Sequence, residues 1–190
     1  PASLMEIRIV LVICRLMNFI VKQGDVVGAY LNATAPKNSF VRLGKEWLSA
    51  LSKEGQQEYL RLMKEGKRIL VPLLMALYGH VLSGALWSQW FADKLKEMGW
   101  KQLRDVSDAV WVIFDEAGRL AGILAVYVDD MIVGATDKVL SWFESKLTEL
   151  VRLKAGLHDV GRLLGGLYRS RRWTEQLDDS IEEHEEIFIS

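Results

Sequence analysis

The sequence predicts an α+β fold with a mainly antiparallel sheet, and three observations support that prediction. Runs rich in β-branched residues alternate along the chain with segments of helical spacing. Two of the β-rich runs flank the turn-like segment 115–119, which is typical of a β-hairpin. The 190 residues are 50% hydrophobic and include only three prolines and one cysteine, so the chain can bury a core, and a collagen-like chain and a disulfide framework are excluded.

The first predicted element is a buried helix at the start of the chain. Ser3 and Glu6 form a Ser-x-x-Glu capping box, and apolar residues dominate the run 7–16 that follows. Cys14 lies in this run. Because the chain has no second cysteine to share a metal or a disulfide, we interpret Cys14 as a small buried hydrophobe.

The elements after this helix alternate between strands and helices. A strand at 19–21 leads towards Asp25. Further along the chain, the patterns predict a helix at 47–62, a strand at 68–73, a helix at 86–98 that ends at Gly99, strands at 109–114 and 123–133, a helix at 137–151 and a short strand at 163–168.

One uncharged stretch is long enough to cross a membrane. Residues 69–92 contain no Asp, Glu, Lys or Arg. The pairs Gly79-His80 and Ser83-Gly84 indicate a break between two elements, so we expect a strand, a turn and the start of a buried helix instead of a membrane span. Arg8 and Arg15 interrupt the apolar runs near the start, which argues against a secretory signal.

Charge is distributed unevenly along the chain. The net charge is −1, but residues 175–190 hold seven acids and no Lys or Arg, which leaves +6 on residues 1–174. A mildly basic body is compatible with a polyanionic partner. We therefore expect a domain over 1–174 and an acidic C-terminal tail over 175–190 that is mobile or faces a partner.

Three acidic residues are candidates for chemistry. Asp129 and Asp130 lie side by side within the apolar run 126–133, and Asp25 ends another apolar strand. Like charges in such a run are costly unless a cation compensates them, and hard cations such as Mg²⁺ prefer carboxylate oxygens. An adjacent pair of aspartates is also typical of a solvated strand end, and spacing alone does not decide between these two interpretations.

Four sequence blocks, taken together, resemble a known family. They are QGDVVGAYLN at 23–32, ALYG at 76–79 with Trp87 after it, YVDD at 127–130, and DVG at 159–161 with LGG at 164–166 after it. In this order they are similar to the copia-type reverse transcriptase domain of long-terminal-repeat retrotransposon polyproteins, over residues 1 to about 170.

The resemblance implies a polymerase palm, an antiparallel sheet backed by helices, with part of the fingers. It implies that Asp25, Asp129 and Asp130 are catalytic and bind two Mg²⁺ ions, with Mn²⁺ as a substitute. Nucleotide-binding roles fall on the backbone carbonyl of Val26 and on Tyr30, which matches the aromatic residue that excludes a 2′-hydroxyl. The positions implied to contact primer and template are Tyr127, Val128, Leu164, Gly165 and Gly166.

The implied activity is that of an RNA-directed DNA polymerase, which transfers deoxynucleotides to a primer 3′-hydroxyl on an RNA or DNA template. The implied partners are template and primer, deoxynucleoside triphosphates, and the rest of a polyprotein with upstream fingers and ribonuclease H, without a membrane. The implied location is intracellular, in a cytoplasmic retrotransposon particle or in the nucleus.

The chain also departs from the family pattern. It has Leu82-Ser83-Gly84 where the family often carries Gln-Ala-Pro, and we expect the triphosphate-binding strands of the fingers to lie upstream of residue 1. Whether this fragment is active by itself is therefore open. The alternative is a catalytically inactive transposon-derived remnant that acts at most as a binding or interaction module.

Overall fold

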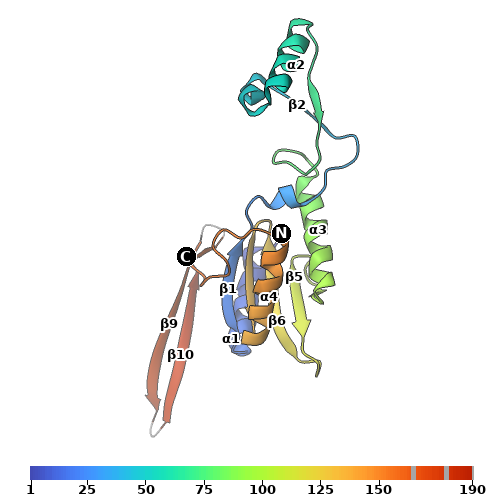
Figure 1. Ribbon diagram of the computed structural model, residues 1–190. Coiled ribbons are helices and arrows are strands. Elements are labelled where there is room, and N and C mark those ends of the chain that lie inside the picture. Colours follow the sequence, from blue (N-terminus) through green and yellow to red (C-terminus); the bar gives the residue numbers. More distant parts are fainter. Residues whose placement is uncertain (164–165, 178–179, 190) are drawn as a thin grey trace. The chain divides into compact units, whose positions relative to one another are not determined.

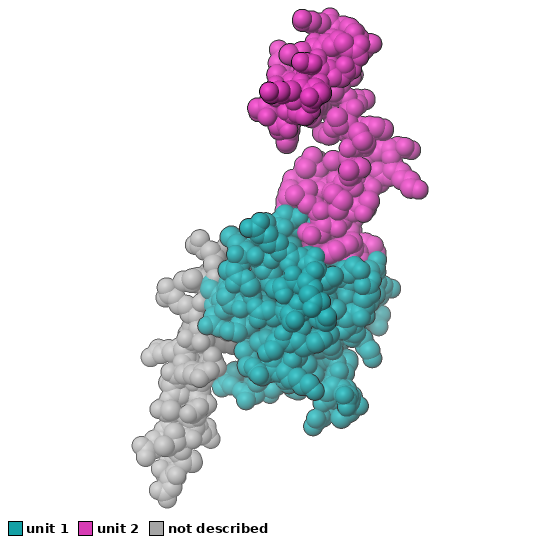
Figure 2. Space-filling model, viewed as in Figure 1, with its two compact units in different colours: residues 1–29, 91–190 teal, residues 30–90 magenta. Residues whose placement is uncertain are grey.

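The computed structural model describes residues 1–163, 166–177 and 180–189 (Figure 1). It is mixed α+β, with an antiparallel sheet backed by helices, as the sequence predicts. The chain divides into two compact units (Figure 2). The first contains residues 1–29 and 91–190, and the second contains residues 30–90.

The first unit is built on a five-stranded antiparallel sheet. Its strands lie in the order β1-β7-β6-β5-β4, so the hairpin β5–β6 and the tighter hairpin β6–β7 form its centre. The strand bounds are β1 (Ile20–Asp25), β4 (Lys101–Gln102), β5 (Val110–Phe114), β6 (Leu120–Tyr127) and β7 (Asp130–Ala135).

Helices α1 (Leu4–Leu16) and α4 (Asp137–Leu150) pack on this sheet. Helix α1 contributes Ile7, Val10, Leu11 and Cys14 to a buried cluster that includes Ile132 of β7. Neighbouring strand residues point to opposite faces, so the buried Met131 and Val133 lie on the other face, where α4 packs. The α4 side chains Leu140, Phe143 and Leu147 are buried.

Helix α1 begins as its capping box predicts. The Ser3 hydroxyl accepts a hydrogen bond from the Glu6 amide, and the Glu6 carboxylate accepts one from the Ser3 amide. Hydrogen bonds from the side chains of Ser107 and Ser3 lower the pKa of Glu6 to about 2. The same carboxylate therefore caps the helix and joins it to the loop before β5.

The second unit contains a two-stranded ribbon and a short helical arm. Strand β2 (Phe40–Arg42) pairs with β3 (Leu70–Pro72), and the chain between them forms η2 (Lys45–Ala50) and α2 (Lys53–Lys64). The prediction of one helix at 47–62 is wrong. Ser52 interrupts it and caps α2, because its hydroxyl accepts a hydrogen bond from the Gly55 amide.

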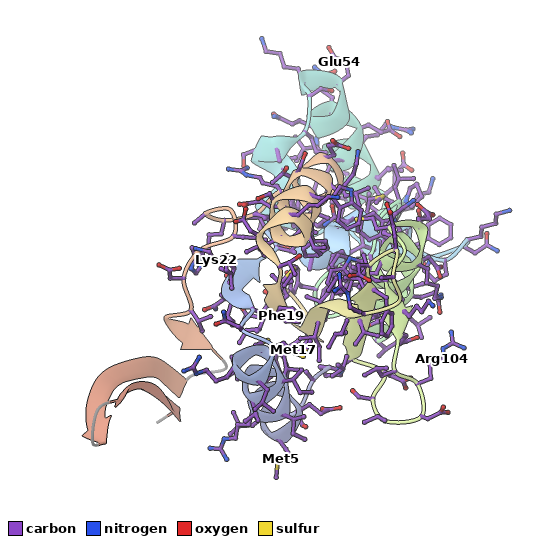
Figure 3. The ribbon with its side chains drawn as sticks, turned by 90° about the horizontal axis from the view of Figure 1, so that it is seen from below. Met5, Met17, Phe19, Lys22, Glu54 and Arg104 are labelled. Carbon is purple, nitrogen blue, oxygen red and sulfur yellow. The ribbon has the colours of Figure 1, made fainter. Side chains whose placement is uncertain are left out.

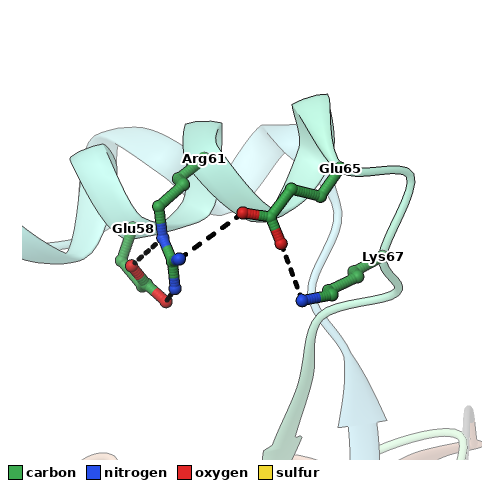
Figure 4. A network of polar contacts seen from close by, with 4 residues as sticks. All are labelled: Glu58, Arg61, Glu65 and Lys67. Carbon is green, nitrogen blue, oxygen red and sulfur yellow. Dashed lines mark hydrogen bonds and ion pairs between the residues drawn. The ribbon is translucent and has the colours of Figure 1, made fainter.

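A chain of ion pairs joins α2 to the residues that follow it (Figure 4). The Arg61 guanidinium lies 2.6 Å from a Glu58 oxygen and 3.4 Å from a Glu65 oxygen, and the Lys67 ammonium lies 2.7 Å from the other Glu65 oxygen. All four side chains are at least 36% exposed, so solvent screens these pairs and they stabilise the arm only slightly.

The uncharged stretch 69–92 folds as predicted. It contains β3, a turn and the first part of α3 (Ser83–Glu97). The Ser83 hydroxyl donates a 2.7 Å hydrogen bond to the Leu77 carbonyl, and the helix ends before Gly99, whose φ of 86° favours glycine. Among the described residues, no helix is both long and apolar enough to cross a membrane.

The C-terminal residues pair as strands. Strand β9 (Gly166–Leu177) lies between β8 (Arg162–Leu163) and β10 (Ser180–Ile189) in an antiparallel sheet. The boundary that we placed between residues 174 and 175 falls inside β9, and Glu182 is the register partner of Glu175. The acidic segment therefore pairs with the residues that precede it.

A close approach of α1 to β7 holds the sheet and the helix together. Cys14 is fully buried, which raises the pKa of its thiol to about 12, and it lies directly over Gly134. A β-carbon at position 134 would overlap the Cys14 sulfur and lie 3.1 Å from its β-carbon. Only glycine lets the helix pack this closely.

We expect Gly134→Ala to lower the free energy of unfolding by about 1–3 kcal/mol, because an added methyl group overpacks this contact. In a Cys14→Ala background the same change should cost at least about 1 kcal/mol less, since the overlapping sulfur is gone. Denaturant unfolding of the four proteins measures the difference. Equal costs in both backgrounds would contradict a direct contact between the two residues.

Candidate active site

The pairing of β1 with β7 brings two of the three candidate carboxylates together. Asp25 is the register partner of Asp130, and Gln23 is the partner of Ile132. Register partners share a face, so Asp25, Asp130 and Gln23 all lie on the face that Ile132 presents to α1. The two acid-bearing strands are therefore neighbours in one antiparallel sheet.

The third carboxylate lies in the turn between β6 and β7. The predicted strand 123–133 is wrong as one element, because Val128 and Asp129 form a two-residue turn within it. Val128 has a φ of 54°, and Asp129 does not have a positive φ, which is the pattern of a type II′ turn. A β-branched residue is strained in this conformation, so the turn is held by its surroundings.

A backbone hydrogen bond joins this turn to β1. The Val26 amide donates to the Asp129 carbonyl at 2.8 Å, and Val26 is buried. The residue after Asp25 is therefore tied to the residue before Asp130. This bond closes the end of the ladder at which the three carboxylates lie.

The chain after α4 runs along the free edge of β1. Gln23 exchanges two backbone hydrogen bonds with His158, and the Lys154 amide donates to the Asp25 carbonyl at 2.9 Å. This edge segment, residues 152–158, packs closely on Gly24, where an added β-carbon would lie 2.8 Å from Leu157. It therefore places the Lys154 side chain beside the carboxylates.

An ion pair lies directly after the edge segment. The Lys22 ammonium of β1 lies 2.8 Å from Asp159, and this contact lowers the pKa of Asp159 (Figure 3 labels Lys22). Asp159 opens the fourth of the sequence blocks described above. In the described part of the chain, the Asp159 side chain contacts Lys22 of β1 and not the three candidate carboxylates.

The carboxylates repel one another. Burial, and then the charges of Asp25 and Asp129, raise the pKa of Asp130 above its usual range. A hydrogen bond from Gln23 and the charge of Lys154 oppose this rise. The Lys154 ammonium lies 3.5 Å from an Asp25 oxygen, at the limit of direct contact.

The donor chemistry of these carboxylates suits a divalent cation. Three aspartates at one end of a ladder supply the hard oxygen atoms that Mg²⁺ prefers, and a cation would relieve the repulsion that raises the pKa of Asp130. Within the described ranges, no group of three or more His, Cys, Asp or Glu side chains is arranged closely enough to hold a metal ion.

The remaining predicted site residues fall in several places. Tyr127 is 39% exposed beside the turn, and Tyr30 belongs to the second unit, where its ring lies 4.6 Å from that of Tyr78. Leu164 and Gly165 lie outside the described residues, and Gly166 begins β9. The primer, template and nucleotide roles of all these residues stay predictions.

Two residues at this site received no role from the sequence. Gln23 precedes Asp25 by two positions, so the alternation of a strand could have placed both on one face. Lys154 lies in a loop after α4, and no local pattern connects it to β1. The position of Lys154 at the site follows only from the hydrogen bonds that hold the edge segment on β1.

The chain was also compared with known proteins. No protein-family model matches it, and no curated protein matches its sequence.

We expect Val128→Gly to stabilise the fold, because glycine adopts a positive φ without strain. The strain relieved in the turn, about 1–2 kcal/mol, should exceed the stability of about 0.5–1 kcal/mol that is lost because glycine has more conformational freedom in the unfolded chain. Val128→Asn should have a smaller effect of the same sign, since asparagine tolerates this conformation. Thermal unfolding measures both, and a lower melting temperature for Val128→Gly would show that the turn is not strained.

We expect Asp130→Asn to raise the melting temperature at pH 7 in the absence of divalent cations. The raised pKa of Asp130 means that its contribution to stability is complete below the unfolded value of about 4 and is lost as pH rises through the folded value. The advantage of the variant should therefore vanish in acid. Asp105→Asn, at an exposed carboxylate, is the matched control. An advantage that persists below pH 4 would contradict the charge repulsion.

Proposed function

We propose that this chain is the palm, with part of the fingers, of an RNA-directed DNA polymerase of the copia type. The observation that carries the proposal is the β1–β7 register, which sets Asp25 opposite Asp130 with Asp129 in the adjoining turn. The four sequence blocks also support it, because the blocks at 23–32 and 127–130 contain the ends of β1 and β7 at which these aspartates lie.

The reaction would be transfer of a nucleotide to a primer. The primer 3′-hydroxyl attacks the α-phosphorus of a deoxynucleoside triphosphate, a new phosphodiester bond forms, and the bond to pyrophosphate breaks. Asp25, Asp129 and Asp130, with the backbone carbonyl of Val26, would hold two Mg²⁺ ions. When bound, such ions activate the hydroxyl and stabilise the leaving pyrophosphate.

Other residues of the chain would position these carboxylates. Gln23 is buried and hydrogen-bonds to Asp130, so it limits the orientations of that carboxylate. The hydrogen bond from Val26 to Asp129 keeps the turn against β1. Lys154 would balance the negative charge while the site holds no metal.

Further residues of the chain would contact the substrates. Tyr30 would lie under the incoming sugar and exclude a 2′-hydroxyl, while Tyr127, Val128 and residues 164–166 would border the primer and template. Contacts to phosphates and to duplex shape would position the nucleic acid, because base pairing carries the sequence information. In this proposal the protein works inside the cell, in a retrotransposon particle or in the nucleus.

The test is extension of a DNA primer on an RNA template in the presence of Mg²⁺. We expect Asp129→Asn to lower the extension rate at least about 100-fold. Loss of a residue that only orients a metal ligand already lowers metal affinity or activity 10–100-fold, and Asp129 would be a ligand itself. Template and primer binding should survive, because it rests on phosphate contacts. Asp137→Asn, at an exposed acid in the first turn of α4, is the control and should extend like wild type.

The assay is run on the chain alone and on the chain joined to the preceding polyprotein segment. Equal extension by wild type and Asp129→Asn would show that the assigned carboxylates are not catalytic. If neither form of the wild type extends a primer and Mg²⁺ does not change its melting temperature, the chain is the inactive remnant.

A further inference from the structure

The edge segment sets a lysine directly opposite Asp25. The Lys154 amide donates to the Asp25 carbonyl at 2.9 Å, next to an antiparallel bridge between Val26 and Leu153. Residues directly opposite each other in such a ladder present their side chains on one face. The ladder therefore brings the Lys154 side chain to the face of the sheet on which Asp25 and Asp130 lie.

Two contacts away from the carboxylates hold the edge segment in this place. The Leu157 amide donates a 2.8 Å hydrogen bond to the Glu144 carboxylate of α4, and the Leu157 side chain packs on Gly24. Both contacts would remain if the ion pair between Lys154 and Asp25 opened. The backbone therefore keeps the lysine near the site whether or not its ammonium touches a carboxylate.

The ion pair itself is loose. The Lys154 ammonium lies 3.5 Å from the Asp25 oxygen, and the Lys154 side chain is 73% exposed. An exposed pair at this distance adds little stability, and the long flexible stem of a lysine lets the ammonium move. Its positive charge also acts on Asp130. The ammonium is thus close enough to act on two carboxylates and is held loosely enough to leave them.

We propose that Lys154 is a tethered cation that competes with a divalent ion for the carboxylates and thereby sets the affinity of the site for that ion. When an ion binds at Asp25, Lys154 must either move away from the carboxylate or repel the ion, and both cost binding free energy. This inference rests on the proposed function, because it takes Asp25, Asp129 and Asp130 as the ion ligands. It adds a residue that controls how tightly they bind.

The test is the Mg²⁺ affinity of the whole chain, measured by isothermal titration calorimetry at low ionic strength. We expect Lys154→Met to bind Mg²⁺ at least about three-fold more tightly than wild type, because the competing charge is gone. The gain should shrink as added salt screens the charge. Lys154→Arg keeps the charge and should bind like wild type. Lys138→Met, at an exposed lysine in the first turn of α4, is the matched control and should not change the affinity.

A second measurement separates this role from a structural one. In EDTA, Lys154→Met should melt slightly below wild type, because the carboxylates lose a positive neighbour. The variant should therefore be less stable without the ion and bind the ion more tightly. If Lys154 only held the edge segment in place, its loss would lower the melting temperature and the Mg²⁺ affinity together, and that result would overturn the inference.

The failure of this inference is distinguishable from the failure of the proposed function. If wild type binds Mg²⁺, Asp25→Asn weakens the binding and Lys154→Met binds no more tightly than wild type, the role of Lys154 is wrong and the carboxylate site stands. If Mg²⁺ binds to neither wild type nor Lys154→Met, the carboxylate site and the role of Lys154 are both wrong.

Discussion

The antiparallel pairing of β1 with β7 connects the core of the first unit to its candidate site. Six residue pairs form this ladder. Near one end, Val21 is paired with Gly134, where the missing side chain lets Cys14 and the rest of α1 approach the sheet. At the other end, Asp25 meets Asp130. A slip of one residue would move Gln23 and Asp25 to the opposite face, so the packing of α1 and the meeting of the carboxylates require the same register.

The carboxylate end of this ladder combines several features that are each unfavourable for stability. Val128 adopts a backbone conformation that β-branched residues avoid, three aspartates lie close together, and Asp130 is partly buried. Each feature costs stability, and the fold compensates with Gln23, with Lys154 and with the bond from Val26 to the turn. Such departures accumulate at functional sites, because a site adapted to a ligand is not optimal without it.

Local signals predicted the elements that local chemistry determines. The Ser3–Glu6 box marked the start of α1, and Gly99 marked the end of α3. The turn at Val128 was missed because valine has little turn propensity and lies in an apolar run, and the tertiary pairing imposes the turn. Strands β2 and β4 were not predicted. They have three and two residues, and strands that short are defined by their pairing and not by a sequence pattern.

The candidate site was predictable to a similar extent. The three aspartates stand out because charge interrupts apolar strands, and Gln23 follows from strand alternation once Asp25 is chosen. Lys154 reaches the site through hydrogen bonds across more than 120 residues of sequence, which no periodicity encodes. Its position depends on how α4 and the segment after it fold back on the sheet.

The edge segment has a further consequence for the behaviour of the protein in solution. An open sheet edge offers unpaired amides and carbonyls to any extended chain, and pairing there leads to aggregation. Residues 152–158 already bond to Gln23 and Asp25 on the outer side of β1, so a foreign strand would first have to displace them. The opposite edge is β4, which is only two residues long and begins with a lysine. Further strands therefore pair poorly with this sheet, because a segment of the chain covers one edge and the strand at the other edge is short and charged.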